Sequence, residues 1–345
     1  MRTRRQKAST QRGNGWQQLA ELARLRLYYG YHHEGVAEMS VAEAAPSANR
    51  PANPGRVLGG FERSYDFFVG VDSDGCAFDA MEIKHKECFI PNTIKHWQLQ
   101  PISSLVRQTA EFVNLYSTGR GLNRWLALVQ VFDLLRERPE VAERGLSIPS
   151  GDRIREFIAS GYPLSGTGMH AYALAHPDPE LDGAVAWTDG VDADIAAMVH
   201  GVPPFPWVRE SLARASTAAD LMVVSATPLA ALSREWSEHR LADHMDVIAG
   251  QEDGTKLQHL QQAAVGRYPS DHVLLVGDAP ADRDTATAAG VLFYPVNPGG
   301  EAASWRRFHD EALDRFLAGT YAGAYQRALV DEFDALLPST PPWQR

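Results

Sequence analysis

Carboxylates follow short apolar runs at two places in the sequence. Asp72 and Asp74 come directly after one run, and Asp278 and Asp282 come after another, much later in the chain. A carboxylate can attack phosphorus and form an aspartyl-phosphate. A second carboxyl group nearby can protonate the leaving oxygen and later deprotonate water. The pattern predicts phosphoryl transfer, with Asp72 as nucleophile and Asp74 as general acid and base, although a turn or a calcium-binding loop would also explain the first pair.

Two other polar residues fit the same chemistry. Ser225 follows a third apolar run, and its hydroxyl could hold a phosphoryl oxygen or cap a helix that begins near Pro228. Lys256 could neutralise the nucleophile and the phosphate, or be a solvated surface lysine. It does not belong to a P-loop, because Thr255 separates it from Gly254.

Four converging carboxylates need a counter-charge. At ~4 Å and an effective dielectric of ~20, each pair repels by roughly 4 kcal/mol, and a phosphate dianion adds to this repulsion. A divalent cation resolves the conflict. Mg²⁺ prefers oxygen ligands and is held by carboxylates together with substrate phosphate, whose developing charge it neutralises. The sequence therefore predicts a Mg²⁺ ion among these carboxylates.

The elements that must bring these groups together alternate in type. Apolar runs typical of strands in a parallel sheet occupy 67–71, 221–224, 245–249, 273–276 and 291–294. Helical stretches of crossover length separate the last four runs, at 228–242, 255–265 and 282–289. This alternation predicts an α/β fold with a parallel sheet, in which ligands bind beyond the carboxyl ends of the strands.

The interval between the first two strands has a different pattern. Helical periodicity appears at 101–116, 122–137, 151–159 and 191–200. We therefore predict an all-helical insertion over 85–215, lying above the site, and an α/β core formed by 61–84 and 216–345.

Residues 1–60 precede this core. They comprise a basic tail, an amphipathic helix at 15–29 and a linker rich in Pro and Gly at 41–60. The tail is either a frayed terminus or a transit peptide. The helix is a candidate contact for a homodimer.

In this order the motifs resemble those of the haloacid dehalogenase (HAD) superfamily of phosphohydrolases. The matching positions are Asp72-Ser73-Asp74-Gly75, Ser225, Lys256 and Gly277-Asp278 followed by Asp282. The resemblance covers about 61–300. It departs at Cys76, where Thr or Val is usual, and in the length of the insertion.

The resemblance implies a Rossmann-like core with an inserted helical cap, a Mg²⁺ cofactor and a phosphoryl-enzyme at Asp72. It implies Asp74 as the general acid and base. The implied metal ligands are the side chains of Asp72 and Asp278 and the main-chain carbonyl of Asp74, with Asp282 as a further ligand or a support.

Substrate contacts are expected from the insertion. Arg120 and Arg124 stand in a glycine-bearing break between two predicted helices, and the guanidinium group suits phosphate or carboxylate. Lys84 lies just past the first motif and could meet an anionic substrate or sit on an exposed helical turn. The segment 161–170, rich in glycine, is expected to be a mobile loop or a turn.

Composition narrows the class of protein. The 345 residues include 33 Lys and Arg against 43 Asp and Glu, so the net charge is −10, which disfavours a general nucleic-acid binder. Cys76 and Cys88 cannot form a disulfide framework and fit the reducing cytosol. No apolar run approaches the ~18 residues of a membrane span. We expect a cytoplasmic, Mg²⁺-dependent phosphomonoesterase that acts on a small phosphorylated metabolite, with neither nucleic acid nor membrane as a partner.

Three alternatives stay open. A sugar-phosphate mutase would use the same core. A phosphonate hydrolase would form a Schiff base through a lysine such as Lys84, Lys86 or Lys95. A catalytically idle scaffold would only bind phosphorylated ligands. The resemblance argues against haloacid dehalogenation, because members with that activity lack the aspartate at the position of Asp74.

Overall fold

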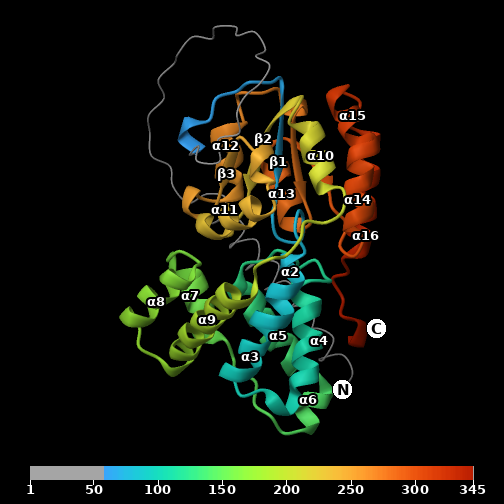
Figure 1. The fold of residues 1–345 in the computed structure, drawn as a ribbon. Helices are drawn as coiled ribbons and strands as arrows, with labels where there is room; N and C mark the ends of the chain where they lie inside the picture. Colours follow the sequence, from blue (N-terminus) through green and yellow to red (C-terminus); the bar gives the residue numbers. More distant parts are fainter. Residues whose placement is uncertain (1–57, 345) are drawn as a thin grey trace.

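The computed structural model describes residues 58–344. The predicted helix at 15–29 and most of the linker at 41–60 lie outside the described residues. Within them, a parallel sheet is flanked by helices, and a second group of helices lies beyond one end of the sheet (Figure 1).

Five parallel strands form the sheet, and the predicted α/β class is confirmed. The strands are β1 (Phe67–Val71), β2 (Ala219–Val224), β3 (Val247–Ala249), β4 (Val273–Gly277) and β5 (Leu292–Pro295). Their order is β3-β2-β1-β4-β5, so β1 is central. The register pairs Val71 with Val223 of β2 and with Val276 of β4. The residues that follow β1, β2 and β4 therefore meet at one edge.

Side chains alternate between two apolar clusters on opposite faces of the sheet, because successive strand residues point to opposite sides. Val69 and Val71 belong to one cluster, and Phe68 belongs to the other. The first face is covered by α10 (Val208–Ala215), α11 (Leu229–Glu238), α14 (Glu301–Arg307), the π-helical η7 (Phe308–Ala312) and α15 (Leu313–Leu317). The second is covered by α12 (Lys256–Ala263) and α13 (Pro280–Ala289), while α16 (Ala324–Leu336) lies beside β5.

Single turns of 3₁₀-helix connect or flank these elements. They are η1 (Leu58–Gly60), η3 (Gln100–Ile102), η4 (Ala242–His244), η5 (Gln251–Asp253), η6 (Ser270–His272) and η8 (Pro342–Gln344). One of them shortens a predicted strand. β3 begins at Val247 rather than at residue 245, because the Met245 amide still donates to the Ala242 carbonyl of η4 at 3.1 Å.

The residues between β1 and α10 are helical and enclose an apolar cluster of their own. The helices are α2 (Ala80–Ile83), the π-helical η2 (Lys84–Phe89), α3 (Ile90–His96), α4 (Ser103–Asn114), α5 (Arg124–Arg136), α6 (Pro139–Glu143), α7 (Asp152–Ser160), α8 (Gly166–Ala175) and α9 (Pro179–Met198). Trp125, Phe132, Phe157 and Trp187 are buried together in this cluster. We call the segment from α2 to α9, residues 80–198, the helical insertion; α10 instead packs with the sheet.

Two predictions for the insertion are wrong in part. Residues 161–170 are not wholly a loop or a turn, since α8 begins at Gly166, where the Ser165 hydroxyl accepts the Gly168 amide at 3.1 Å. The helix expected at 191–200 begins as early as Pro179, capped by Asp178, whose carboxylate accepts the Glu180 amide at 2.9 Å. Both starts carry side-chain caps, which periodicity alone does not reveal.

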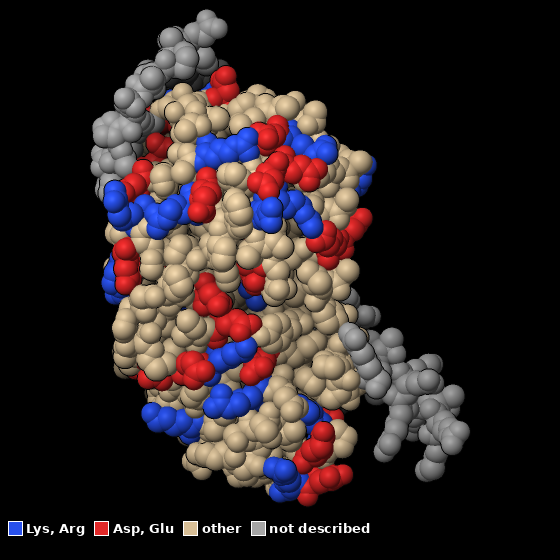
Figure 2. Space-filling view, turned by 45° about the vertical axis from the view of Figure 1, so that its right-hand side comes forward, with Lys and Arg blue, Asp and Glu red and all other residues tan. Residues whose placement is uncertain are grey.

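The surface and the helices add two observations. On the face drawn in Figure 2, acidic and basic side chains are interleaved, and neither sign gathers into one large patch there. Among residues 58–344, no helix combines the length and the apolar character required to cross a membrane.

The end of the chain ties the sheet to the insertion. After α16, the Pro338 carbonyl accepts the Thr118 amide at 3.4 Å. The Trp343 ring then packs edge-on against Phe112 at 5.5 Å, and the Arg138 guanidinium lies 4.3 Å from its centroid. Residues 338–344, here called the C-terminal strap, thus cross from α16 to the insertion (Figure 1).

Replacing Trp343 with alanine should lower the free energy of unfolding by about 1–3 kcal/mol, because one aromatic pair and one cation–π contact are lost. Urea unfolding of both proteins measures the difference. The matched control is Leu336→Ala at the end of α16, where the side chain is 46% exposed and little should change. Equal stability of Trp343→Ala and the parent protein would show that the strap contributes nothing.

Candidate active site

Three buried carboxylates meet at the carboxyl edge of the sheet. Oxygens of Asp72, Asp278 and Asp282 lie within 4.8 Å of one another, and the three residues are 6%, 1% and 0% exposed. The pairing of β1 with β4 causes this meeting, because the Asp72 amide continues the ladder by donating to the Val276 carbonyl at 3.0 Å. Asp282 lies in the first turn of α13 and accepts the Ala279 amide at 3.1 Å.

Lys256 bridges two of these carboxylates. Its Nζ lies 2.7 Å from Asp72 Oδ2 and 2.6 Å from Asp282 Oδ1. Lys256 is the first residue of α12, where Thr255 caps the helix by accepting the Gln258 amide at 3.2 Å. Burial raises the pKa of Asp72 well above its usual value, with Lys256 opposing the shift and the neighbouring carboxylates adding to it. The predicted placement of a lysine beside Asp72 is what the structure shows.

Arg120 reaches the third carboxylate from the insertion. Its Nη2 and Nε lie 2.6 and 2.8 Å from Asp278 Oδ2, and Nε also donates to the Asp278 main-chain carbonyl at 3.1 Å. Arg120 is 3% exposed. The other oxygen, Asp278 Oδ1, is buried and has no hydrogen-bond partner among residues 58–344. Burial raises the pKa of Asp278 to about 6 although Arg120 opposes the shift.

Glycines permit this close approach. Gly75 has φ +77°, and a Cβ there would lie 2.5 Å from Asp278 Oδ2 and 2.6 Å from Arg120 Nη2. Gly121 has φ +78°, and a Cβ there would lie 2.6 Å from the Cβ of Ala279. L-residues with a side chain adopt this backbone region at a cost. The turn after β1 and the loop between α4 and α5 therefore need glycine to seat Arg120.

Asp74 stands apart from the three clustered carboxylates. Lys84 Nζ lies 2.5 Å from both of its carboxylate oxygens, and the Thr227 hydroxyl donates to Asp74 Oδ2 at 2.8 Å. Burial alone would raise the pKa of Asp74, but Lys84 and Thr227 hold it below its usual value. Four carboxylates were expected to converge, but the cluster contains three. The Asp74 side chain instead forms a second ion pair with a cation of the insertion.

Ser225 lies at the same edge, directly after β2. It is buried, and its hydroxyl accepts the Thr227 amide at 3.2 Å. Helix α11 begins only at Leu229, with Pro228 at its N-cap position and no side-chain cap. Ser225 therefore closes a tight turn at the strand end rather than capping α11.

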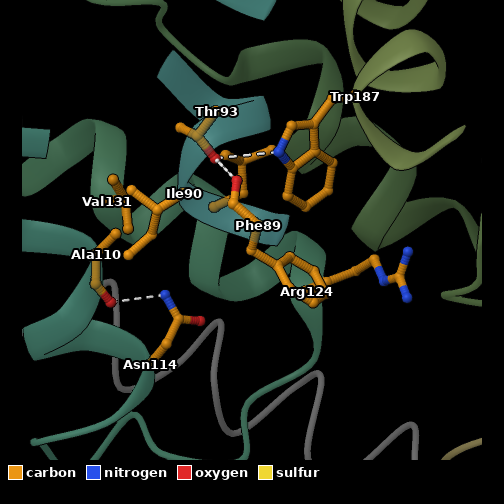
Figure 3. Close-up of a pocket in the computed structure, with 9 residues that line it drawn as sticks. Phe89, Ile90, Thr93, Ala110, Asn114, Arg124, Val131 and Trp187 are labelled. Atoms are coloured by element: carbon orange, nitrogen blue, oxygen red, sulfur yellow. Dashed lines mark hydrogen bonds between the residues drawn. The ribbon is translucent and has the colours of Figure 1, made fainter. Parts of the chain in front are cut away.

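Arg124 pairs with residues of the insertion and not with the clustered carboxylates of Asp72, Asp278 and Asp282. Its Nη1 donates to Thr188 and to Asp192, both at 2.8 Å, and its guanidinium lies 5.1 Å from the centroid of Phe89. Figure 3 shows Arg124 beside a pocket within the insertion, with Trp187 and Phe89 nearby and the guanidinium directed away from Val131.

Sequence reasoning missed a set of residues behind the first motif. The Ser73 hydroxyl donates to Glu235 Oε2 at 3.2 Å and accepts the Trp236 indole N–H at 2.9 Å. Burial, followed by the charge of Asp74, raises the pKa of Glu235 to about 7. The lone signal was the small polar residue between two aspartates, and nothing in the sequence pointed to Glu235.

His85 also lies near these charges. Its Nδ1 is buried and finds no hydrogen-bond partner within the described residues, and its ring stacks on Phe89 at 4.8 Å. Burial and the nearby Arg120 lower the pKa of His85 to about 3, so the imidazole is neutral. The turn that contains Lys84 and His85 thus faces the site instead of being wholly solvated.

The donors fit a hard divalent cation. All three clustered groups offer oxygen atoms, and Asp278 Oδ1 is a buried acceptor that lacks any donor. Mg²⁺ takes oxygen ligands of this kind. Asp72, Asp278 and Asp282 therefore form a set that could hold the ion, in agreement with the predicted cofactor.

Gly75→Ala should disrupt the site, because the new methyl group meets Asp278 and Arg120 and forces a strained backbone. We expect a loss of stability of at least ~1–2 kcal/mol from the left-handed backbone alone, together with weaker binding of Mg²⁺. Urea unfolding and calorimetric titration measure the two effects. Gly59→Ala is the control, because a Cβ at Gly59 has no atom within 4 Å. Wild-type stability and Mg²⁺ affinity in Gly75→Ala would contradict this account.

Glu235→Gln should change how stability depends on pH. The pKa of Glu235 is raised from 4.5 to about 7, so between these values the folded protein binds more protons than the unfolded chain. The contribution of Glu235 to the free energy of unfolding is fully present below pH 4.5 and is lost as the pH rises through 7.

The Glu235→Gln variant lacks this loss. Its free energy of unfolding, relative to that of the parent protein, should therefore rise by on the order of 2–3 kcal/mol from pH 5 to pH 8. Urea unfolding across that range measures it. The exposed Glu210→Gln is the control. A constant difference between Glu235→Gln and the parent would rule out the raised pKa.

Comparison with known proteins gives similarity in solved structures alone. No protein-family model and no curated protein sequence matches the chain. A haloacid dehalogenase-like hydrolase from Streptococcus pneumoniae is 14% identical, with 71% of this chain and 91% of that chain covered and a TM-score of 0.39. A candidate phosphoglycolate phosphatase from Lactobacillus delbrueckii subsp. bulgaricus is 14% identical, with coverage of 75% and 100% and a TM-score of 0.43.

A candidate beta-phosphoglucomutase from Bacteroides vulgatus is 14% identical, with coverage of 74% and 91% and a TM-score of 0.37. At such identities and TM-scores, the active-site geometry and not the similarity has to carry any functional conclusion. The solved structures that the chain resembles include hydrolases of the HAD superfamily, which is the family that its sequence motifs resemble.

Proposed function

We propose that the protein is a Mg²⁺-dependent phosphomonoesterase of the HAD type. Its substrate is a small phosphorylated metabolite, whose phosphoryl group is transferred to Asp72 to form an aspartyl-phosphate. The observation that carries the proposal is the placement of Asp72. Asp72 directly follows the central strand, Lys256 lies 2.7 Å from its carboxylate, and two further carboxylates lie within 4.8 Å. A buried carboxylate with a cation beside it is suited to attack phosphorus.

The side chains of Asp72, Asp278 and Asp282 would hold Mg²⁺, with the main-chain carbonyl of Asp74 as a further ligand. When bound, the ion neutralises charge on the transferring phosphoryl group. Lys256 adds a second positive charge at the nucleophile. The Ser73 amide donates to Asp72 Oδ1 at 2.8 Å and so orients the carboxylate.

In the first step, an Asp72 oxygen forms a bond to phosphorus while the bond from phosphorus to the leaving oxygen breaks. Asp74 gives a proton to that oxygen. In the second step, Asp74 takes a proton from water, the water oxygen bonds to phosphorus, and the bond to Asp72 breaks to release phosphate. Lys84 keeps Asp74 ionised in the present arrangement, which is the state that the second step requires. Withdrawal of Lys84 would favour the protonated state for the first step.

The helical insertion acts as a cap in this proposal. It supplies Arg120 and Lys84, each of which pairs with a carboxylate of the core, and the clustered carboxylates beneath it are buried. Substrate therefore enters when the insertion moves away from the sheet.

The same burial supports a second candidate function, a sugar-phosphate mutase. Asp72, Asp278 and Asp282 are almost inaccessible to solvent. A site that excludes water in this way could pass the phosphoryl group from Asp72 to a second hydroxyl group of the substrate instead of to water. Analysis of the products distinguishes the two functions, because a mutase yields an isomeric phosphate ester and little inorganic phosphate.

The central test is Asp72→Asn, assayed for Mg²⁺-dependent phosphate release from an aryl phosphate and from a panel of phosphorylated metabolites. We expect a loss of at least ~10³-fold, since removing the nucleophile of a covalent enzyme costs up to ~10⁶-fold. The control is Asp66→Asn, because the Asp66 carboxylate is 82% exposed and pairs with Arg63 at the surface.

Activity that survives in Asp72→Asn would exclude the aspartyl-phosphate. Phosphorylated ligand bound by the wild-type protein without any turnover would instead favour a phosphate-binding scaffold.

A further inference from the structure

Asp278 is shared between the sheet and the insertion. On Asp278, Arg120 contacts Oδ2 and the main-chain carbonyl, whereas Oδ1 is buried without a partner in the described part of the chain. Since the Asp72 and Asp282 carboxylates lie within 4.8 Å, a cation held by these three groups would share Asp278 with the Arg120 guanidinium. The two positive groups would therefore sit on one carboxylate.

We propose that Arg120 is a positioning residue that links the helical insertion to cation binding, so that a bound divalent cation and a seated Arg120 oppose each other through Asp278. The inference rests on the proposed function only in requiring that these carboxylates bind a cation. It adds a coupling between the cation and the position of the insertion, which hydrolysis itself does not require.

Two effects of Arg120 on the cation compete. By holding Oδ2, Arg120 orients Asp278, and supporting contacts of this kind usually strengthen metal binding by ~10–100-fold. Its charge, however, would repel a dication held by the same carboxylate, and burial would leave this repulsion poorly screened. The place of Asp278 directly after β4 also orients this residue, so the orienting effect of Arg120 is partly redundant. On this ground we take the repulsion to be the larger of the two effects.

Coupling of this kind is reciprocal. If Arg120 weakens cation binding, the cation must weaken the seating of Arg120 by the same factor. The loop around Arg120 would report the change, because the Arg120 amide donates to Ser117 at 3.0 Å and the Leu122 amide donates to Gly119 at 3.0 Å. The same loop approaches α13 through Gly121 and Ala279. A cation should thus loosen the contact between the insertion and the core.

Calorimetric titration with Mn²⁺ tests the first half of the linkage. Arg120→Gln should bind Mn²⁺ at least ~10-fold more tightly than the wild type, and Arg120→Lys, which keeps the charge, should remain close to it. The matched control is Arg138→Gln, since Arg138 is an equally buried arginine of the insertion, 3% exposed, that contacts Thr109 and Trp343 rather than the site. Unchanged or weaker binding in Arg120→Gln overturns the proposal.

Hydrogen exchange tests the second half, and its decisive measurement is made on the wild-type protein. Adding Mg²⁺ should accelerate exchange of the amides in 117–122, and the same addition to Arg120→Gln should leave them unaffected. Slower or unchanged exchange in the wild type overturns the proposal.

The proposal and the enzyme function fail separately. If the wild-type protein releases phosphate but Mg²⁺ does not change exchange of the 117–122 amides, only the proposed coupling is contradicted. If Mg²⁺ changes their exchange but no phosphate is released, only the enzyme function is contradicted. If the wild-type protein binds neither Mn²⁺ nor Mg²⁺, both the coupling and the predicted cofactor are contradicted.

Discussion

The balance of charge around three buried carboxylates is the constraint on which the rest of the site depends. Asp72, Asp278 and Asp282 would repel one another by roughly 4 kcal/mol per pair at close approach if no cation were near. Lys256 bridges two of them, and Arg120 pairs with the third. Two cationic side chains do not fully neutralise three carboxylates. Asp278 Oδ1, which has no partner among the described residues, is where further positive charge would be accepted.

Backbone geometry makes this balance possible. The central place of β1 brings Asp72 beside the end of β4, and the insertion that follows β1 returns its α4–α5 loop to the same edge. Arg120 reaches Asp278 only because Gly75 and Gly121 leave room where a side chain would collide with the partners. The glycine of the first motif therefore serves the contact with the insertion as well as the turn after the strand.

The strands and the placement of Asp72, Lys256 and Asp278 were predictable, because buried strands read as apolar runs and polar residues at their ends must share one edge. The partners that individual side chains of the site contact could not be predicted from the sequence. The sequence did not indicate that Arg120 pairs with Asp278, and its predicted contact with substrate stays a prediction. Asp74 was predicted to join the clustered carboxylates, but its side chain pairs with Lys84. These outcomes depend on packing between segments far apart in sequence, which periodicity does not encode. Glu235 was missed for the same reason.

Two kinds of contact that hold the insertion rest on different forces, and this difference bears on how the insertion can move. The C-terminal strap holds it through the Trp343 ring, whose contacts with Phe112 and Arg138 do not involve the carboxylates of the site. Arg120 and Lys84 hold it through ion pairs with Asp278 and Asp74, carboxylates of the candidate site. A ligand that competes for these carboxylates would loosen this anchor while the strap stays in place. Such an insertion would pivot about the strap and return to the same position over Asp72.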